Sequence, residues 1–362
     1  MKKSLIALAV LAASGAAMAQ SSVTLYGIAD AFVGSKEISS VNAAGVITKQ
    51  RQTVVDSSGL NGSRWGLKGS EDLGGGLKAL FVLESGLNID TGAAASGTSL
   101  FNRQAFVGLD SSFGTVSLGR QYSAYDSVRG TFLSAQGNST SFDATNSATI
   151  NTALLTGLPN TATPAQRLAS LNSYGGRVGA WTGYQTRIDN SIRYATPNIS
   201  GFQAAVVYGL GENKTPTTDA TKNASVSLTY ANGPIGVGVT HADDELIQDF
   251  HVKNTAIGGY YDFGVAKAFL AYNQAKITGL AKQKEWAVGV RAPLGATTLV
   301  AQYAQSKGDD LGKSTSVALE GQYSLSKRTT AYAAFNRTKV DLPILTSDFK
   351  NSIFGLGVRH AF

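Results

Sequence analysis

The chain of 362 residues contains no cysteine, so disulfide bonds cannot hold it together. Exported domains with a small core usually depend on such bonds. In a chain of this length, a closed and fully hydrogen-bonded sheet offers another source of cohesion, because closure leaves no strand edge unpaired.

Long apolar runs are also scarce. Beyond the N-terminus, no segment approaches the roughly 20 apolar residues of a transmembrane helix, and the mean hydropathy is −0.02. The apolar run at residues 5–13 is too short to span a membrane, follows two lysines and precedes the small residues 17–19. This order is typical of a secretory signal peptide. We therefore expect residues 1–19 to be removed and residues 20–362 to form a single domain.

Long runs of basic residues are missing as well. The formal net charge is +7, from 31 basic and 24 acidic residues, and it falls to about +5 once the two signal lysines are removed. The basic residues are scattered along the chain, which is not typical of a nucleic-acid-binding patch. No nucleic-acid partner is therefore expected.

Catalytic and cofactor motifs are absent or incomplete. Residues 308–314 resemble a phosphate-binding loop but have one residue too few between their glycines. Residues 241–245 are an acidic cluster that we interpret as an external loop rather than a metal site. The three histidines, His241, His251 and His360, lie in no known catalytic motif. We expect no enzyme activity, no cofactor and no metal.

What the chain does contain is alternation of apolar and polar residues with a period of two. In residues 316–325, for example, Val317, Leu319 and Tyr323 alternate with serine, glutamate and glutamine. About sixteen such segments occur, at residues 23–33, 62–69, 77–84, 101–109, 115–120, 186–195, 201–209, 225–230, 235–240, 254–263, 265–275, 284–292, 296–306, 314–325, 328–338 and 352–362. Short turns and longer polar loops alternate between them.

This pattern predicts an all-β fold, a transmembrane antiparallel β-barrel of about sixteen strands with its polar face inward. The alternative is a secreted, water-soluble sandwich or β-helix. The segments are longer than the usual five or six residues of such strands, and their apolar faces carry recurrent Tyr, Phe and Trp. Both observations favour the barrel.

Residues 121–185 break the pattern. They show no sustained period, are rich in Ser, Thr, Asn, Gly and Ala, and are far longer than an ordinary connection. A compact domain rarely contains so long a loop unless the loop has a function. We predict that it folds into the barrel and narrows it, with Asp126, Arg129 and Asp143 as candidate residues of the narrowing.

The last strand and several internal motifs resemble those of one family. The chain ends in alternation at Phe354, Leu356, Val358, His360 and Phe362, similar to the terminal signal that the barrel-assembly machinery reads, with His360 where Tyr is more usual. The other matching motifs are residues 23–27, 63–69, 103–109, 114–120 and 190–194. With these motifs the whole mature chain resembles general Gram-negative porins of the betaproteobacterial subgroup.

The resemblance implies a homotrimer of sixteen-stranded barrels in the outer membrane, in contact with its lipid and lipopolysaccharide. It also implies a third external loop inside the lumen, at residues 121–185, and passive diffusion of ions and small hydrophilic solutes. The loop lacks the Pro-Glu-Phe-Gly signature of enteric relatives. An adhesin, or a plugged or gated barrel that hydrolyses lipids or peptides, is the alternative, and conductance in a planar bilayer would distinguish them.

Alternation also assigns charged side chains to the inner face. The bases are Arg64, Lys68, Arg187 and Arg193, and the acids are Asp30, Glu84 and Asp189. Arg103 is assigned inward by the resemblance, because its own strand alternates poorly. Family porins oppose wall arginines to acids of the inner loop, here Asp126 and Asp143, which would create a transverse field. The alternative is that the arginines only pair with acids and stiffen the lumen.

The two sets of charges nearly balance, and screening over about 8 Å at physiological salt weakens their field further. The mildly basic chain therefore predicts a weak anion preference.

The outward face of the first strand carries small residues, including Gly27 and Ala29, which permit close approach of a neighbour. Arg120 also faces outward, beside Val116 and Leu118. An outward arginine is costly in lipid. We place these residues in a subunit interface, the alternative for Arg120 being a side chain that reaches beyond the membrane.

Overall fold

The computed structural model describes residues 22–41, 47–97, 99–137, 140–145, 147–148, 181–279, 282–309, 312–341 and 349–362. The predicted signal peptide and residues 149–180 of the long stretch lie outside this set. Within the described part of the chain, no helix has the length and apolar character needed to cross a membrane.

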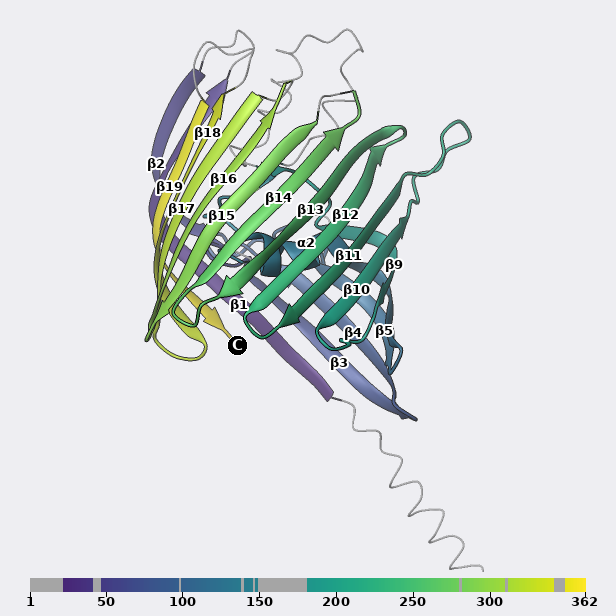
Figure 1. Cartoon of the computed structure of the whole chain (residues 1–362). Coiled ribbons are helices and arrows are strands. Elements are labelled where there is room, and N and C mark those ends of the chain that lie inside the picture. The colour runs from purple at the N-terminus through teal and green to yellow at the C-terminus, as the bar shows by residue number, and fades with distance from the viewer. Residues whose placement is uncertain are drawn as a thin grey trace, which may run out of the picture.

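One antiparallel sheet closes on itself to form the wall of the molecule (Figure 1). Its strands are β1 (Ser22–Val41), β2 (Ile47–Ser57), β3 (Arg64–Gly74), β4 (Leu77–Gly86), β5 (Gln104–Ser111), β6 (Gly114–Tyr122), β9 (Arg187–Ala195), β10 (Phe202–Leu210), β11 (Lys222–Asn232), β12 (Ile235–Ile247), β13 (Phe250–Asp262), β14 (Lys267–Ile277), β15 (Gln283–Leu294), β16 (Thr297–Gly308), β17 (Gly312–Ser324), β18 (Thr329–Asp341) and β19 (Phe349–Ala361). The prediction of an all-β barrel is confirmed.

The wall has sixteen positions, because two strands share one of them. β3 pairs with the first part of β1, from Ser22 opposite Ser70, and β2 pairs with the rest, up to Val41 opposite Ile47. Residues 47–57 were predicted to belong to a polar loop, and that prediction is wrong. Polar side chains predominate on both faces of this segment, and the adjacent Val54 and Val55 break any alternation, so the sequence could not reveal the strand. Backbone pairing with the extended β1 forms it.

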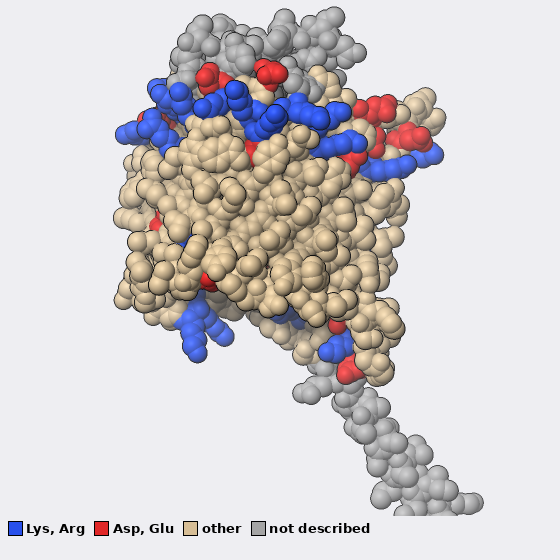
Figure 2. Space-filling model, viewed as in Figure 1, with Lys and Arg blue, Asp and Glu red and all other residues tan. Residues whose placement is uncertain are grey.

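Side chains divide cleanly between the two faces of the wall. On β11, Leu228 points outward with 53% of its surface exposed, while the neighbouring Ser227 points inward and is 5% exposed. The broad middle band of the outer surface carries few charged groups, which gather along the upper rim and at the lower edge (Figure 2). An apolar outer band around a polar interior is the arrangement expected for a barrel in lipid.

The sheet closes where the two ends of the described chain meet. β1 pairs with β19, from Ile28 opposite Ala361 to Glu37 opposite Ser352. Just beyond this ladder, Gly27 and Phe362 exchange two backbone hydrogen bonds of 3.1 Å. A Cβ atom on Gly27 would lie 2.3 Å from the ring of Phe362, so this contact requires glycine.

Part of the long stretch lies on the inner face of the wall. It was predicted to have no regular structure, but contains the short helix α2 (Ala124–Val128), the π-helical turn η1 (Arg129–Leu133) and the small parallel pair β7 (Ser147–Ala148) and β8 (Trp181–Thr182). Glycines of the wall permit the close approach: Cβ atoms built on Gly238 and Gly258 would lie 2.6 Å from side chains of Val128 and Leu133. Figure 1 shows α2 within the ring of strands.

The acidic cluster at residues 241–245 was interpreted as an external loop, and this is also wrong. It lies within β12, where Asp244 points inward and is 1% exposed. Within the described residues, no group of three or more His, Cys, Asp or Glu side chains could hold a metal ion.

Candidate functional site

A cluster of basic side chains surrounds one carboxylate on the inner face of β3 to β5. Arg103 Nε lies 2.7 Å from Glu84 Oε1, and Arg64 Nε lies 3.6 Å from Glu84 Oε2. The Tyr26 hydroxyl donates to the same carboxylate at 3.1 Å. Glu84 is only 4% exposed, and two guanidinium groups that face the interior offset its buried charge.

Tyr122 extends the cluster to β9. Its hydroxyl accepts hydrogen bonds from Arg103 Nη2 at 2.7 Å and from Arg187 Nη2 at 3.0 Å. The Arg187 guanidinium also lies over the Tyr122 ring, 4.6 Å from its centre, and Lys68 Nζ lies 5.3 Å from the ring centre of Tyr26. Four cations therefore gather near a single carboxylate and two tyrosine side chains.

Arg193 lies further along β9, opposite Ser117 of β6. Ser117 is 2% exposed and faces inward, between the exposed Val116 and Leu118. Among the described residues, the guanidinium of Arg193 forms no hydrogen bond or ion pair. All five predicted bases thus lie on the inner face, and four of them are together.

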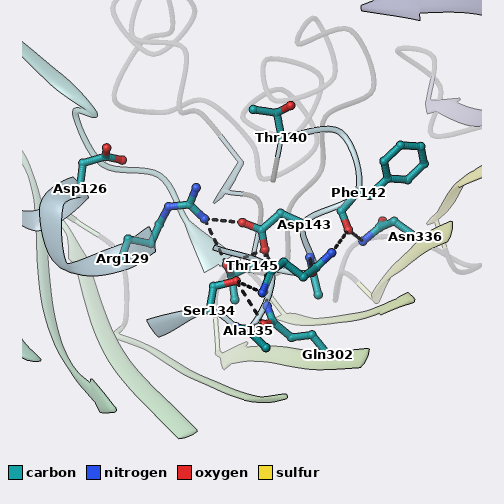
Figure 3. Close-up of polar contacts among 12 residues, drawn as sticks. Asp126, Arg129, Ser134, Ala135, Thr140, Phe142, Asp143, Thr145, Gln302 and Asn336 are labelled. Carbon is teal, nitrogen blue, oxygen red and sulfur yellow. Dashed lines mark hydrogen bonds and ion pairs between the residues drawn. The ribbon is translucent and has the colours of Figure 1, made fainter. Parts of the chain in front are cut away.

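The predicted acids of the long stretch are held by local partners. Asp143, 2% exposed, forms an ion pair with Arg129 and accepts two hydrogen bonds of 2.8 Å from Thr145 (Figure 3). Asp126 accepts a hydrogen bond of 2.5 Å from the Tyr184 hydroxyl. Burial, followed by the Asp126 charge, raises the pKa of Tyr184 well above its usual value, so it remains a donor. The charge of Asp143 is therefore matched within the stretch itself.

Inward side chains of the wall attach the first half of the stretch. Gln302 Oε1 on β16 accepts from the Ala135 amide at 2.6 Å, and Asn336 Nδ2 on β18 donates to the Phe142 carbonyl at 3.3 Å (Figure 3). Gln136 Nε2 donates at 2.6 Å to Glu320 on β17. Ala135, Gln136 and Phe142 are thus fixed against three neighbouring strands.

A second set of inward side chains holds the end of the stretch, and sequence reasoning did not find it. Glu285 accepts from the Thr182 amide and Asp244 from the Gln185 amide, both at 2.7 Å, and Asn254 donates to the Gly183 carbonyl at 3.1 Å. The sequence does place these polar residues at inward positions of alternating strands. Their partners could not be predicted, because they are backbone groups of an irregular segment.

Asp30 faces inward, but it does not line the interior as a free acid. It is fully buried and accepts hydrogen bonds from the amides of Gly59, Leu60 and Asn61 and from the Tyr332 hydroxyl. Its carboxylate therefore secures the segment between β2 and β3.

Asp189 was predicted to face inward, and the structure places it outside. Its side chain is 65% exposed and lies 2.5 Å from Arg120 Nη1. Arg120 is opposite Ala105 on the face that Leu118 and Val107 occupy. The register shifts between Gly119 and Gln121, and Asn190 has φ of 50°. This bulge reverses the faces of Ile188 and Asp189, whereas Arg187, the first residue of β9, reaches the inner cluster through Tyr122.

The small outward residues of β1 lie near the closing strand. Gly27 is buried beneath Phe362 of the same chain, and Ala29 is half-buried opposite His360. Their role in a subunit interface, and that of Phe362 in assembly, remain predictions.

Comparison with known proteins places the chain among outer-membrane channels. A family model described as Gram-negative porin matches residues 5–341. The chain is 35% identical over 398 residues to outer membrane porin protein 32 of Delftia acidovorans and 31% identical over 428 residues to an outer membrane porin protein of Bordetella pertussis, covering all of both relatives. A solved structure described as an anion-selective porin from Comamonas acidovorans has a TM-score of 0.71 and 27% identity, and the match covers 95% of this chain and all of that one.

Proposed function

The chain belongs to the Gram-negative porin family, and we propose that it forms a water-filled channel of the outer membrane with a weak preference for anions. Ions and small hydrophilic solutes diffuse through it passively, without a chemical step or a cofactor. A barrel with sixteen wall positions and a polar inner face supports this, because closed sheets of about this size leave an aqueous lumen.

The anion preference rests on the imbalance of charge around Glu84. Arg64 and Arg103 share this one carboxylate, while Arg187 and Lys68 contact the side chains of Tyr122 and Tyr26. The acids expected to balance them are engaged elsewhere, since Asp143 pairs with Arg129, Asp30 binds backbone amides and Asp189 lies outside. This locally positive part of the inner wall attracts anions, and the similarity to a porin described as anion-selective agrees with this sign.

The reversal potential across a planar bilayer in a salt gradient tests the preference. Replacing Arg64 and Arg103 with alanine removes two of the clustered charges, so the potential should move toward cation selectivity. Lys214→Ala is the control, because Lys214 lies on an exposed loop with its side chain 71% exposed. If the double variant keeps the wild-type potential, the basic cluster does not set selectivity.

We propose further that residues 121–185 form the constriction. The contacts of residues 123–137, 140–145 and 181–185 with the inner wall support this. Deleting residues 137–163, most of which lie outside the described set, should raise single-channel conductance. Unchanged conductance in a variant that migrates as a folded barrel would place this part of the loop outside the lumen.

A homotrimer is the proposed assembly, with the Arg120–Asp189 pair in its interface. The pair lies on an outward face formed otherwise by apolar side chains such as Val107 and Leu118, where contact with a neighbour would shield it from lipid. The terminal Phe362 is proposed as the residue read by the barrel-assembly machinery. A monomeric mass in mild detergent would contradict the trimer.

Lipopolysaccharide is the proposed partner of the upper rim. Lys284, Lys307 and Lys313 lie directly opposite one another on β15, β16 and β17 and face outward. Like charges in register destabilise a sheet, so a row of them fits a polyanion such as the phosphates of this lipid. Trp286 and Tyr303, with ring centres 5.0 Å apart, lie just below as an interfacial aromatic pair.

A further inference from the structure

The outer wall has an apolar recess near its lower edge. It crosses β15 to β19, has a volume of about 570 Å³ and is lined on the outer face by Leu299, Leu319, Gly321, Ala333 and Phe335, among others. Gly321 lies opposite both Leu299 and Ala333. A Cβ atom on Gly321 would meet only a Leu299 methyl group, at 3.8 Å, so glycine forms the floor. The volume is roughly four times that of a ~150 Å³ apolar cavity that accommodates benzene.

The recess lies at the depth of lipid tails. β17 ends at Ser324, so the following turn begins about 10 Å from Gly321 along the strand at ~3.4 Å per residue. With the strand tilted by about 40°, this is roughly 8 Å of depth. Half of a hydrocarbon core is about 15 Å thick. Between recess and turn, Tyr323 faces outward and is 52% exposed, where an interfacial aromatic belongs.

The turn below the recess carries two adjacent cations, Lys327 and Arg328, both exposed. The other short turns at this end of the described wall contain no Lys or Arg: residues 75–76, 112–113, 196–201, 233–234, 263–266 and 295–296. No ion pair of Lys327 or Arg328 occurs among the described residues. The two cations of this turn thus lie beneath the recess and are available to a ligand.

We propose that this recess and turn bind an anionic glycerophospholipid of the periplasmic leaflet. One acyl chain packs over Gly321, between Leu299 and Leu319, and the phosphate contacts Lys327 and Arg328. Hydrocarbon surrounds the wall in any case, so apolar burial alone selects no ligand. The shape of the recess holds the acyl chain, and the two cations distinguish an anionic headgroup from a zwitterionic one.

Native mass spectrometry of the full mature protein tests the site. The protein is released from detergent with equal amounts of phosphatidylglycerol and phosphatidylcholine that carry the same chains. The wild type should retain the anionic lipid with a preference of roughly 30-fold, the effect expected of two cations that each contribute about 1 kcal/mol. Lys327→Gln with Arg328→Gln should bring the ratio toward one. Gly321→Leu fills the floor and should lower retention of both lipids.

Matched controls separate the site from general effects. Lys78→Gln removes a cation next to another turn at the same end of the wall, and Val317→Leu enlarges an outward residue on β17 outside the recess. Both should bind as the wild type does, and heat-dependent gel migration verifies folding of every variant. The proposal is wrong if the Lys327 and Arg328 changes leave the lipid ratio intact. It is also wrong if Gly321→Leu lowers the oligomer mass instead, because the recess would then hold a second copy of the chain.

Discussion

Tyr122 has an unusual position among the charged side chains of the inner wall, because two guanidinium groups share its one oxygen. A carboxylate there would cancel positive charge, whereas a phenol accepts both hydrogen bonds and leaves the charge of Arg103 and Arg187 intact. Hydrogen bonds to charged groups contribute about 1.5–3 kcal/mol. Tyr122 thus acts as a positioning residue for two cations that repel one another.

Tyr122→Phe keeps the ring beneath Arg187 but removes the shared acceptor. The two guanidinium groups should separate, and the anion preference should fall by less than in Arg103→Ala, because no charge is lost. The measurement is the reversal potential, with Tyr323→Phe on the outer surface as the control. A potential equal to the wild type would show that Arg103 and Arg187 keep their places without the phenol.

For single residues, the sequence predicted the correct face of the wall wherever the strand was regular. Period two placed Arg64, Lys68 and Arg193 on the inner face. It failed for Asp189, because the bulge at Asn190 reverses the faces and nothing in local composition marks it. Asp30 was placed on the correct face, but its partners are amides near residue 60, and only the folded chain brings them together.

The sequence predicts the parts of the strands that lie within the membrane, but not the parts of the strands that extend above it. The β12 core has clear apolar alternation, whereas its upper part, residues 241–247, has charged residues on both faces and continues only because β13 pairs with it. β2 was missed for the same reason. In these upper parts polar residues occupy both faces, so the sequence does not alternate even where burial does, and backbone pairing forms the strands.

The inner segment depends on wall glycines, and Gly238→Val tests this. The added side chain would overlap Val128 and Phe132 of α2 and η1, at a cost of about 1–3 kcal/mol if the core must adjust. We expect the segment to be displaced into the lumen and single-channel conductance to fall. Val239→Leu, which faces outward on the same strand, should conduct as the wild type does. An increase in conductance would mean that the segment leaves the lumen instead.

For the whole molecule, cohesion depends on the seam between β1 and β19. Deleting Phe362 removes two backbone hydrogen bonds and the ring that covers Gly27. Refolding from urea into detergent, without any assembly machinery, should give a barrel less stable by about 0.5–3 kcal/mol, the range of most single changes. The urea midpoint of unfolding measures this.

Phe113→Leu is the control for that experiment, since Phe113 is 81% exposed in a turn. A midpoint equal to the wild type would limit Phe362 to its role as an assembly signal. A Gly27→Leu variant should reproduce the loss, because its side chain would occupy the space of the ring.

The pairing of Ile28 with Ala361 also sets the order of events during biogenesis. β1 is the first strand to be synthesised, but it can pair with β19 only after nearly the whole polypeptide has been exported. Until then the backbone groups at the edges of β1 and β19 remain unpaired, and strand pairing between residues so far apart in the sequence is slow. A chain that terminates early therefore yields no narrower channel, only an aggregation-prone fragment. Once the barrel is closed, no edge strand remains at which unfolding can start. Its stability is then set by the rate of unfolding.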